Sequence, residues 1–340
     1  MRIVTSTIAL GGAFALVGCA TTPVGLPPVE VAALAETDPV GTAAEDAADD
    51  PAIWRNTADP ANSRIVGTDK KAGLHVYDLT GRTLFSETSG LINNVDLTEL
   101  PDGRVIVVAS DRNDPANAML RAWEMDKASG RLTLLGTTPG GAGEGYGFCL
   151  RRDGDAVHAF SALKKGTVEE YRLTFPGGEI RSEHLRTRKI PTQIEGCVAD
   201  PRDGTLYIGE ENAGIWRFAA EETQGEIVAP IDNLYLVADV EGLALVTEGD
   251  NGGWLIASSQ GDNAFAVFRL PGMEPVGRFH VAAGQFGSVE ETDGIELVAG
   301  DFGPTFPEGL FVAQDGKNEP RAQNFKLVSW QAIKEVLGLR

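Results

Sequence analysis

A short segment that recurs six times along the chain constrains its fold more than any other feature of the sequence. The copies begin at residues 49, 93, 146, 194, 240 and 292, so successive starts lie 44, 53, 48, 46 and 52 residues apart. Each copy is followed by a turn, an apolar strand, a polar tip and another strand. Four-stranded units at this period are typical of β-propeller blades. The sequence therefore predicts an all-β chain, a six-bladed β-propeller of four-stranded antiparallel blades. Two sandwich domains, the alternative, would not produce six matching strand starts.

The stretch from residue 193 to 218 shows one unit most clearly. Apolar runs at 197–199 and 206–208 are separated by the turn sequence 200–204, and the run 215–218 alternates as a half-buried strand does. A unit of this size is not stable alone. The ring must also close, and we expect residues 29–40 to supply an outer strand for the last blade. A strand over 324–330 and a short amphipathic helix over 331–338 are expected to end the chain.

The N-terminus resembles an export signal. Arg2 precedes an apolar stretch over residues 8–18 that is too short to span a bilayer, and Leu16-Val17-Gly18-Cys19 resembles the bacterial lipobox. We expect an outer-membrane lipoprotein anchored through Cys19, on its periplasmic or surface side. The alternative is a signal peptide cleaved near Ala20, which would leave a soluble periplasmic or secreted protein. The predicted divisions are a signal peptide (1–19), a Pro-rich tether (20–28) and a six-bladed propeller domain (29–340).

The formal net charge of −20 limits the partners of the chain. Excess negative charge argues against nucleic acid and against anionic membrane surfaces. An anionic substrate would also be repelled, by about 1 kcal/mol for each charge pair at about 4 Å in water and about 4 kcal/mol at an effective dielectric constant near 20. Either the substrate is not anionic or a positive group is recruited.

Oxygen-bearing side chains recur at the second position of the six segments. The six positions hold Asp50, Asn94, Gly147, Glu195, Glu241 and Asp293, and all except Gly147 offer a side-chain oxygen. Innermost strands surround the axis of a propeller, so equivalent positions form a ring. The next strand of each blade ends on the same face, and the sequence there reads Asp69-Lys70-Lys71, Asp111-Arg112, Lys164-Lys165, Glu210-Glu211, Gln260 and Asp315. Charged loop tips are usually only solvated, but five oxygens recurring at one repeat position predict a site.

Hard oxygen ligands without paired histidines or a C-x-x-C motif favour calcium over zinc. Bound calcium would also convert the acidic rim into a receptor for a polyanion. Lys70, Arg112 and Lys164 could then hold phosphate oxygens by charge-assisted hydrogen bonds.

Two cysteines, Cys149 and Cys197, remain in an oxidising compartment. Buried free thiols are one possibility. Their positions on inner strands of adjacent blades favour a disulfide.

Motifs in every blade, over roughly residues 35–330, resemble the β-propeller phytases. They include 49–54 (DDPAIW), 68–71 (TDKK), 93–96 (NNVD), 146–148 (YGF), 239–243 (DVEGL), 292–294 (TDG) and 323–326 (QNFK). The resemblance implies a six-bladed, calcium-dependent 3-phytase that removes phosphate from inositol hexakisphosphate (phytate), usually as its calcium complex. It implies attack by a water or hydroxide held between calcium ions, without a covalent nucleophile. A monomer is expected. A non-catalytic propeller platform and a calcium-dependent lactonase or phosphodiesterase are the alternatives.

The resemblance also assigns site residues. The implied calcium ligands are Asp49, Asp50, Asn94, Glu195, Glu211, Asp239, Glu241 and Asp293, with backbone oxygens of Pro51 and Val95. The implied substrate-binding residues are Lys70, Lys71, Arg112, Tyr146, Lys164 and Gln260. Of these two sets Glu195, Lys70, Arg112, Tyr146 and Lys164 are expected to be catalytic, and Lys164 is favoured over Lys165.

Two positions depart from the family pattern. Gly287 stands where the family has an aspartate, and Lys317, beside Asn318, stands where it has a glutamate. Both belong to a peripheral calcium site of the family. We expect that site to be weak or lost.

Overall fold

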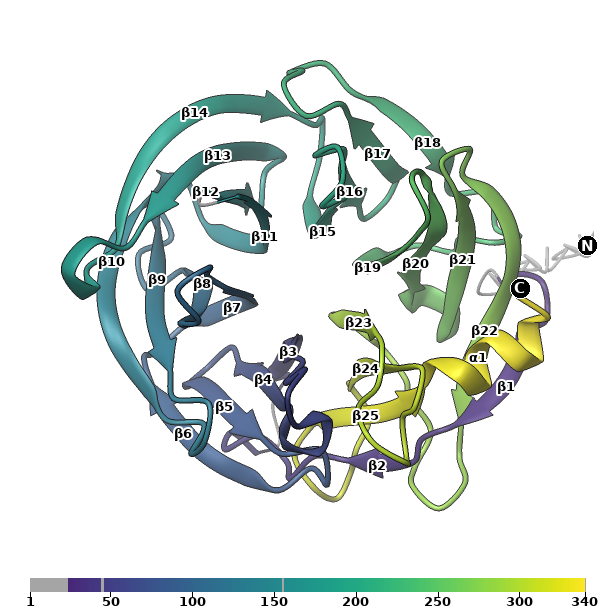
Figure 1. The fold of residues 1–340 in the computed structure, drawn as a ribbon. Helices are drawn as coiled ribbons and strands as arrows, with labels where there is room; N and C mark the ends of the chain where they lie inside the picture. The colour runs from purple at the N-terminus through teal and green to yellow at the C-terminus, as the bar shows by residue number, and fades with distance from the viewer. Residues whose placement is uncertain (1–23, 44–45, 155, 340) are drawn as a thin grey trace, which may run out of the picture.

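A computed structural model describes residues 24–43, 46–154 and 156–339. Six sheets are arranged around a central axis, with β3, β7, β11, β15, β19 and β23 innermost (Figure 1). The predicted six-bladed β-propeller is confirmed. Among the described residues, no helix is both long and apolar enough to span a membrane.

The first three blades each consist of four consecutive antiparallel strands. Blade 1 contains β3 (Ala48–Trp54), β4 (Arg64–Asp69), β5 (Gly73–Tyr77) and β6 (Thr83–Thr88). Blade 2 contains β7 (Ile92–Glu99), β8 (Val105–Asp111), β9 (Asn117–Met125) and β10 (Leu132–Ala142). Blade 3 contains β11 (Gly145–Asp153), β12 (Ala156–Leu163), β13 (Thr167–Thr174) and β14 (Arg181–Lys189).

Of the last three blades, blades 5 and 6 each include a strand from the N-terminal segment. Blade 4 contains β15 (Ile194–Ala199), β16 (Leu206–Glu210), β17 (Gly214–Phe218) and β18 (Glu226–Pro230). Blade 5 contains β19 (Val240–Glu248), β20 (Gly252–Ser259), β21 (Ala264–Leu270) and β22 (Glu274–Ala282), with β1 (Val29–Ala32) as a fifth strand. Blade 6 contains β23 (Ile295–Ala299), β24 (Gly309–Asp315), β25 (Asn324–Ser329) and β2 (Ala35–Glu36).

The N-terminal segment closes the ring as predicted, and it also adds a strand to a second blade. β2 pairs antiparallel with β25, with Ala35 opposite Leu327, and forms the expected outer strand of the last blade. β1 was not expected to pair separately, yet it lies parallel to β22 of blade 5. The segment therefore joins two blades (Figure 1).

The C-terminal helix is confirmed as α1 (Trp330–Leu337), which buries Trp330 and Ile333. The preceding strand ends at Ser329 because the Ser329 hydroxyl caps the helix by accepting from the Ala332 amide. Gly338 ends the helix in a left-handed conformation.

The end of the predicted tether is part of the folded structure. The Gly25 amide donates to Asp262 at 2.8 Å, and the Leu26 amide donates to the Leu234 carbonyl at 2.8 Å. Arg278, buried beside Asp262, donates to the Leu26 carbonyl. The predicted signal peptide and Cys19 lie outside the described residues.

The core lies between neighbouring blades, because each sheet is covered on both faces. Phe265 and Phe279 of blade 5 pack against Phe311 of blade 6 with ring centroids 5.0–5.4 Å apart. All three are almost completely buried. Burying each such side chain stabilises the fold by about 1.5–3 kcal/mol.

Candidate active site

Strand register shows which residues of the six blades are equivalent. Pro51, Val95, Phe148, Cys197, Leu243 and Ile295 each pair with the equivalent residue of the next strand. Counting back two places from each gives Asp49, Asn93, Tyr146, Glu195, Glu241 and Asp293, which we call the ring position. The ring predicted from sequence was therefore wrong by one residue in blades 1–3.

The physical reason for this error is that the spacing between copies varies from 44 to 53 residues, so spacing alone does not fix the alignment. The register shift just before the paired residue is the same in blades 1–5 and displaces their inner strands alike. The doublets Asp49-Asp50 and Asn93-Asn94 offered the same residue type at both positions. Either alignment therefore looked consistent in those two blades.

Glycine follows the ring position in four blades, and it lets the inner strands approach one another. A Cβ at Gly196 would collide with the Glu241 carbonyl, and one at Gly242 would lie 2.7 Å from the Asp293 carbonyl. The Gly242 amide donates to that same carbonyl at 2.7 Å. These backbone contacts bring the ring side chains together around the axis.

The ring carboxylates are buried close to one another. Oxygens of Glu195, Glu211 and Glu241 lie within 4.8 Å of each other. Burial, followed by the charges of Asp49, Glu241 and Asp293, raises the pKa of Glu195 well above its usual range. Burial and the charge of Asp293 do the same to the pKa of Glu241. Each carboxylate therefore disfavours ionisation of its neighbours.

Two of these carboxylates have oxygens without a partner. Asp49, 2% exposed, has no hydrogen bond at Oδ1, and Glu241, 5% exposed, has none at Oε2. Buried polar atoms are nearly always satisfied, and these unpartnered carboxylate oxygens are free to coordinate a cation. An all-oxygen donor set fits calcium. The residues present therefore fit the metal that the sequence predicts.

Lys70 is a cation built into this cluster. Its Nζ lies 2.8 Å from Asp293, 3.0 Å from Asp49 and 2.9 Å from Asp46. Burial alone would lower the pKa of Lys70, but the carboxylates of Asp49, Asp293 and Asp46 outweigh it and raise the pKa. Lys70 therefore stays charged, and one positive charge faces several carboxylates. Gln260 also reaches the cluster and donates to Asp293 Oδ1 at 2.7 Å, and its predicted role in substrate binding stays a prediction.

A second group of predicted residues surrounds Tyr146. Lys164 Nζ lies 4.8 Å and Arg112 Cζ 5.9 Å from the centre of its ring. Burial, followed by the charges of Glu195 and Glu241, raises the pKa of Tyr146, so its phenol stays protonated. The Arg112–Tyr146–Lys164 group therefore adjoins the ring.

Lys71, Lys165 and Asp239 are more exposed than the ring carboxylates, whereas Glu211 is buried beside Glu195 and Glu241. Lys165 and Lys71 are exposed. Asp239 is half-buried, and burial raises its pKa. Glu211 accepts from Gln193 at 2.7 Å, and burial followed by the charge of Asp239 raises its pKa. A ligand role for Asp239 and Glu211 stays a prediction.

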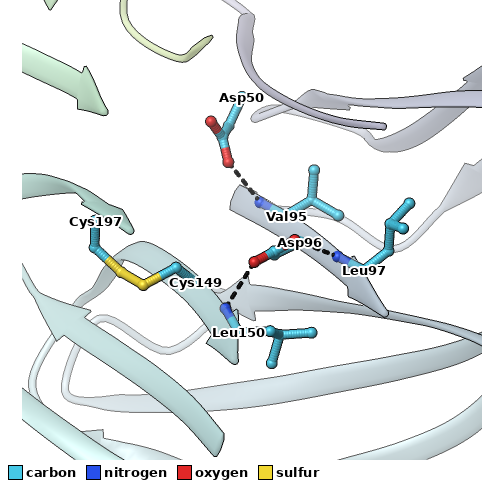
Figure 2. Close-up of a disulfide and its surroundings, with 7 residues drawn as sticks. All are labelled: Asp50, Val95, Asp96, Leu97, Cys149, Leu150 and Cys197. Carbon is cyan, nitrogen blue, oxygen red and sulfur yellow. Dashed lines mark hydrogen bonds between the residues drawn. A yellow bond between two sulfur atoms is a disulfide. The ribbon is translucent and has the colours of Figure 1, made fainter. Parts of the chain in front are cut away.

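Asp50 and Asp96 connect adjacent inner strands beside the ring. The Asp50 carboxylate accepts from the Val95 amide at 3.0 Å, and the Asp96 carboxylate accepts from the Leu150 amide at 2.7 Å (Figure 2). Blade 1 is thus tied to blade 2, and blade 2 to blade 3. The hydrogen bond of Asp50 is a structural role that the sequence did not indicate, and its predicted role as a ligand stays a prediction.

A disulfide continues this series from blade 3 to blade 4. Cys149 of β11 and Cys197 of β15 are bonded, with Cα atoms 5.7 Å apart (Figure 2). The predicted pairing is confirmed. It lies three residues after Tyr146 and two after Glu195, so it braces both strands.

The peripheral positions that depart from the family pattern do not form a carboxylate site. Lys317 Nζ lies 3.2 Å from Glu291 Oε1. Asn318 accepts from Arg321 at 3.2 Å, and Gly287 has open space where a side chain would be. The Lys317 ammonium therefore lies beside the Glu291 carboxylate, which would have to bind a calcium ion at this position.

Sequence reasoning assigned no role to three residues that contact the site. Asp46 pairs with Lys70, Gln193 bridges toward Tyr146 and Glu211, and Asn93 contacts Glu195. Asn93 could have been found by choosing the other residue of its doublet. Asp46 and Gln193 precede their segments and carried no repeat signal.

Pockets adjoin the site and also lie away from it. One of about 330 Å³ lies beside Lys164 and is lined by Glu144, Lys165 and Thr167. A larger one, of about 550 Å³, lies between the far ends of blades 4 and 5. Its two arginines, Arg202 and Arg217, are paired with carboxylates, so it shows no free cation for phosphate.

Comparisons with known proteins show which family and which solved fold the chain resembles. A family model described as Phytase matches residues 6–340. A curated relative, the 3-phytase of Bacillus subtilis (strain 168), is 37% identical over 330 residues, which cover 91% of this chain and 86% of that protein. A chain in the crystal structure of the mitotic checkpoint complex aligns with a TM-score of 0.51 and 13% identity, over 98% of this chain and 86% of that one. At that identity the likeness shows the fold alone.

Proposed function

The chain belongs to the phytase family, and on this premise we propose that it releases phosphate from phytate in a calcium-dependent reaction at the ring. The observation that carries the proposal is the position of the buried ring carboxylates beside the Arg112–Tyr146–Lys164 group. Carboxylates with unpartnered oxygens suit a divalent cation, and adjacent cations suit phosphate. A divalent cation held by the carboxylates, together with the adjacent side-chain cations, suits the binding of a phosphomonoester group on a polyanionic substrate.

The calcium ligands in this proposal are side chains of the ring and its border. They are Asp49, Glu195, Glu211, Asp239, Glu241 and Asp293, with Asp50 and Asn94 as further candidates. When bound, calcium supplies positive charge, lowers the pKa of water and withdraws charge from phosphoryl oxygens.

The remaining chemistry belongs to side chains. Lys70, Arg112 and Lys164 bind phosphate oxygens and stabilise the charge that develops on them during in-line displacement. Tyr146, protonated because its pKa is raised, donates a hydrogen bond to the same group. Glu195 orients the attacking water and accepts its proton as the new P–O bond forms. The P–O bond to inositol breaks, and the inositol oxygen takes a proton from solvent and leaves as the alcohol. Lys71 and Gln260 border the bound substrate.

One assay tests the proposal. Phosphate is measured from phytate with calcium and after chelation, and release only with calcium is expected. A binding platform would release phosphate under neither condition. A phosphodiesterase or lactonase would instead prefer its own substrates. Either result would overturn the proposed function.

We also propose export with lipid attachment at Cys19, which the lipobox supports. Gly25, six residues after Cys19 in the sequence, is hydrogen-bonded to Asp262 of blade 5. Incorporation of a clickable fatty acid that is lost in Cys19→Ser would support the anchor. Equal labelling of both proteins would rule it out.

A further inference from the structure

Asn93 occupies the ring position of blade 2. The other five blades present Asp49, Tyr146, Glu195, Glu241 and Asp293 there, and the proposed function already assigns each of those a role. Equivalent ring positions project toward one axis in a propeller. Asn93 therefore has the same access to the cluster as the four carboxylates.

The contacts of Asn93 are those of a site residue. Its Nδ2 donates to Glu195 Oε1 at 2.6 Å, although the two residues are 102 apart in sequence. The side chain is 0% exposed, and its carbonyl Oδ1 has no hydrogen-bond partner. A buried amide is usually satisfied at both ends, so the free oxygen points to an absent ligand.

The backbone around Asn93 is held firmly. The Asn94 amide donates to Ser110 Oγ at 3.0 Å, and that hydroxyl donates to the Tyr146 carbonyl at 2.6 Å. The start of β7 is thus fixed to the start of β11. Asn93 is pre-positioned against Glu195 rather than dependent on a ligand for its placement.

An amide fits this position better than a carboxylate would. An amide, unlike a carboxylate, can donate to Glu195 and at the same time offer a neutral oxygen to a cation. A fifth ring carboxylate would lose the donor and add repulsion to a cluster that already disfavours ionisation.

We propose that Asn93 is a calcium ligand through its carbonyl oxygen and a positioning residue for Glu195 through its amide. This assignment rests on the proposed function of the ring. The assignment gives the Asn93 side chain two roles, calcium binding and the positioning of Glu195, and two substitutions can distinguish these roles experimentally.

The test compares Asn93→Ala, Asn93→Asp and Asn117→Ala in the full chain. Asn117→Ala is a matched control, because Asn117 also donates to a carboxylate, Asp114 at 2.9 Å, but is exposed. Calcium binding is measured by calorimetry and thermal shift, and kcat is measured with phytate at saturating calcium. Asn93→Asp keeps the shape and an oxygen ligand but removes the donor.

Asn93→Ala is expected to weaken calcium binding and to lower kcat, each about ten- to hundredfold. Asn93→Asp should retain calcium binding within a few-fold and still lose kcat, because Glu195 is no longer held. Asn117→Ala should match the parent. If Asn93→Ala binds calcium and turns over like the parent, the proposal is wrong. If the parent itself releases no phosphate, the proposed function fails instead.

Discussion

Lys70 Nζ and Asp293 Oδ2 lie 2.8 Å apart although 223 residues separate them in the sequence. Lys70 follows β4 of blade 1, and Asp293 precedes β23 of blade 6, so the pair spans the junction where the ring closes. It places one cation against a cluster of at least four carboxylates. Without metal, the negative charge of the ring carboxylates therefore exceeds the positive charge of Lys70. We expect this excess to lower the free energy of unfolding.

Without calcium, ring carboxylates should destabilise the fold at neutral pH. Burial, followed by the charge of Asp49, raises the pKa of Asp293 to about 7, above its value of about 3.9 in an unfolded chain. Between those values the folded state binds more protons than the unfolded state. The free energy of unfolding therefore falls as pH rises from about 4 to 7, by about 1.4 kcal/mol per pH unit for one such group.

Glu241→Gln isolates this effect. Since the pKa of Glu241 is also raised, chiefly by burial, the variant should be more stable than the parent at pH 8 with chelator, and the difference should vanish near pH 4. Calcium should then stabilise the variant less than the parent. Thermal unfolding across pH measures both, with exposed Glu221→Gln as the control. A variant less stable than the parent at pH 8 would contradict the argument.

Glu195→Gln should nearly abolish turnover and leave the fold intact. The amide keeps the size of the side chain but cannot accept the proton of the attacking water, and loss of a general base costs about 10²–10⁴ in kcat. Phosphate release at saturating calcium gives kcat, and circular dichroism checks the fold. Retained activity would remove Glu195 from the mechanism.

The number of blades and their order followed from sequence because a period of about 50 residues and alternating strands can be read directly along the chain. Which residue of each inner strand occupies the ring position did not follow from sequence. The doublets at 49–50 and 93–94 satisfy two alignments, and only strand pairing decides between them. The Lys70–Asp293 pair and the Asn93–Glu195 hydrogen bond depend on ring closure. No local pattern encodes such contacts.

Reduction of the Cys149–Cys197 disulfide should lower stability and turnover together. It closes a loop with a sequence separation of 48 and braces the strands of Tyr146 and Glu195. Losing such a link typically costs about 2–5 kcal/mol. Unfolding with and without reductant, and Cys149→Ser/Cys197→Ser, give the stability change. Apart from Cys19, two free thiols in the denatured, unreduced protein would show that the bond is absent.

Restoring two acids should strengthen the peripheral calcium site that we expect to be weak or lost in this chain. Lys317 pairs with Glu291 at 3.2 Å, and a side chain at Gly287 would meet open space. Gly287→Asp/Lys317→Glu removes the cation and adds two carboxylates near Glu291 and Asn318. Calcium at about 100 times its Kd for the new site would add about 2.7 kcal/mol to the free energy of unfolding.

Calcium-dependent thermal shifts of parent and double variant measure this gain, and Lys317→Gln controls for loss of the lysine alone. The gain should appear only in the double variant and should leave kcat unchanged, because the new site lies outside the ring. Calcium-soaked crystals of the parent supply the decisive comparison. A fully coordinated ion between Gly287 and Asn318 in the parent would show that Lys317 does not displace the metal.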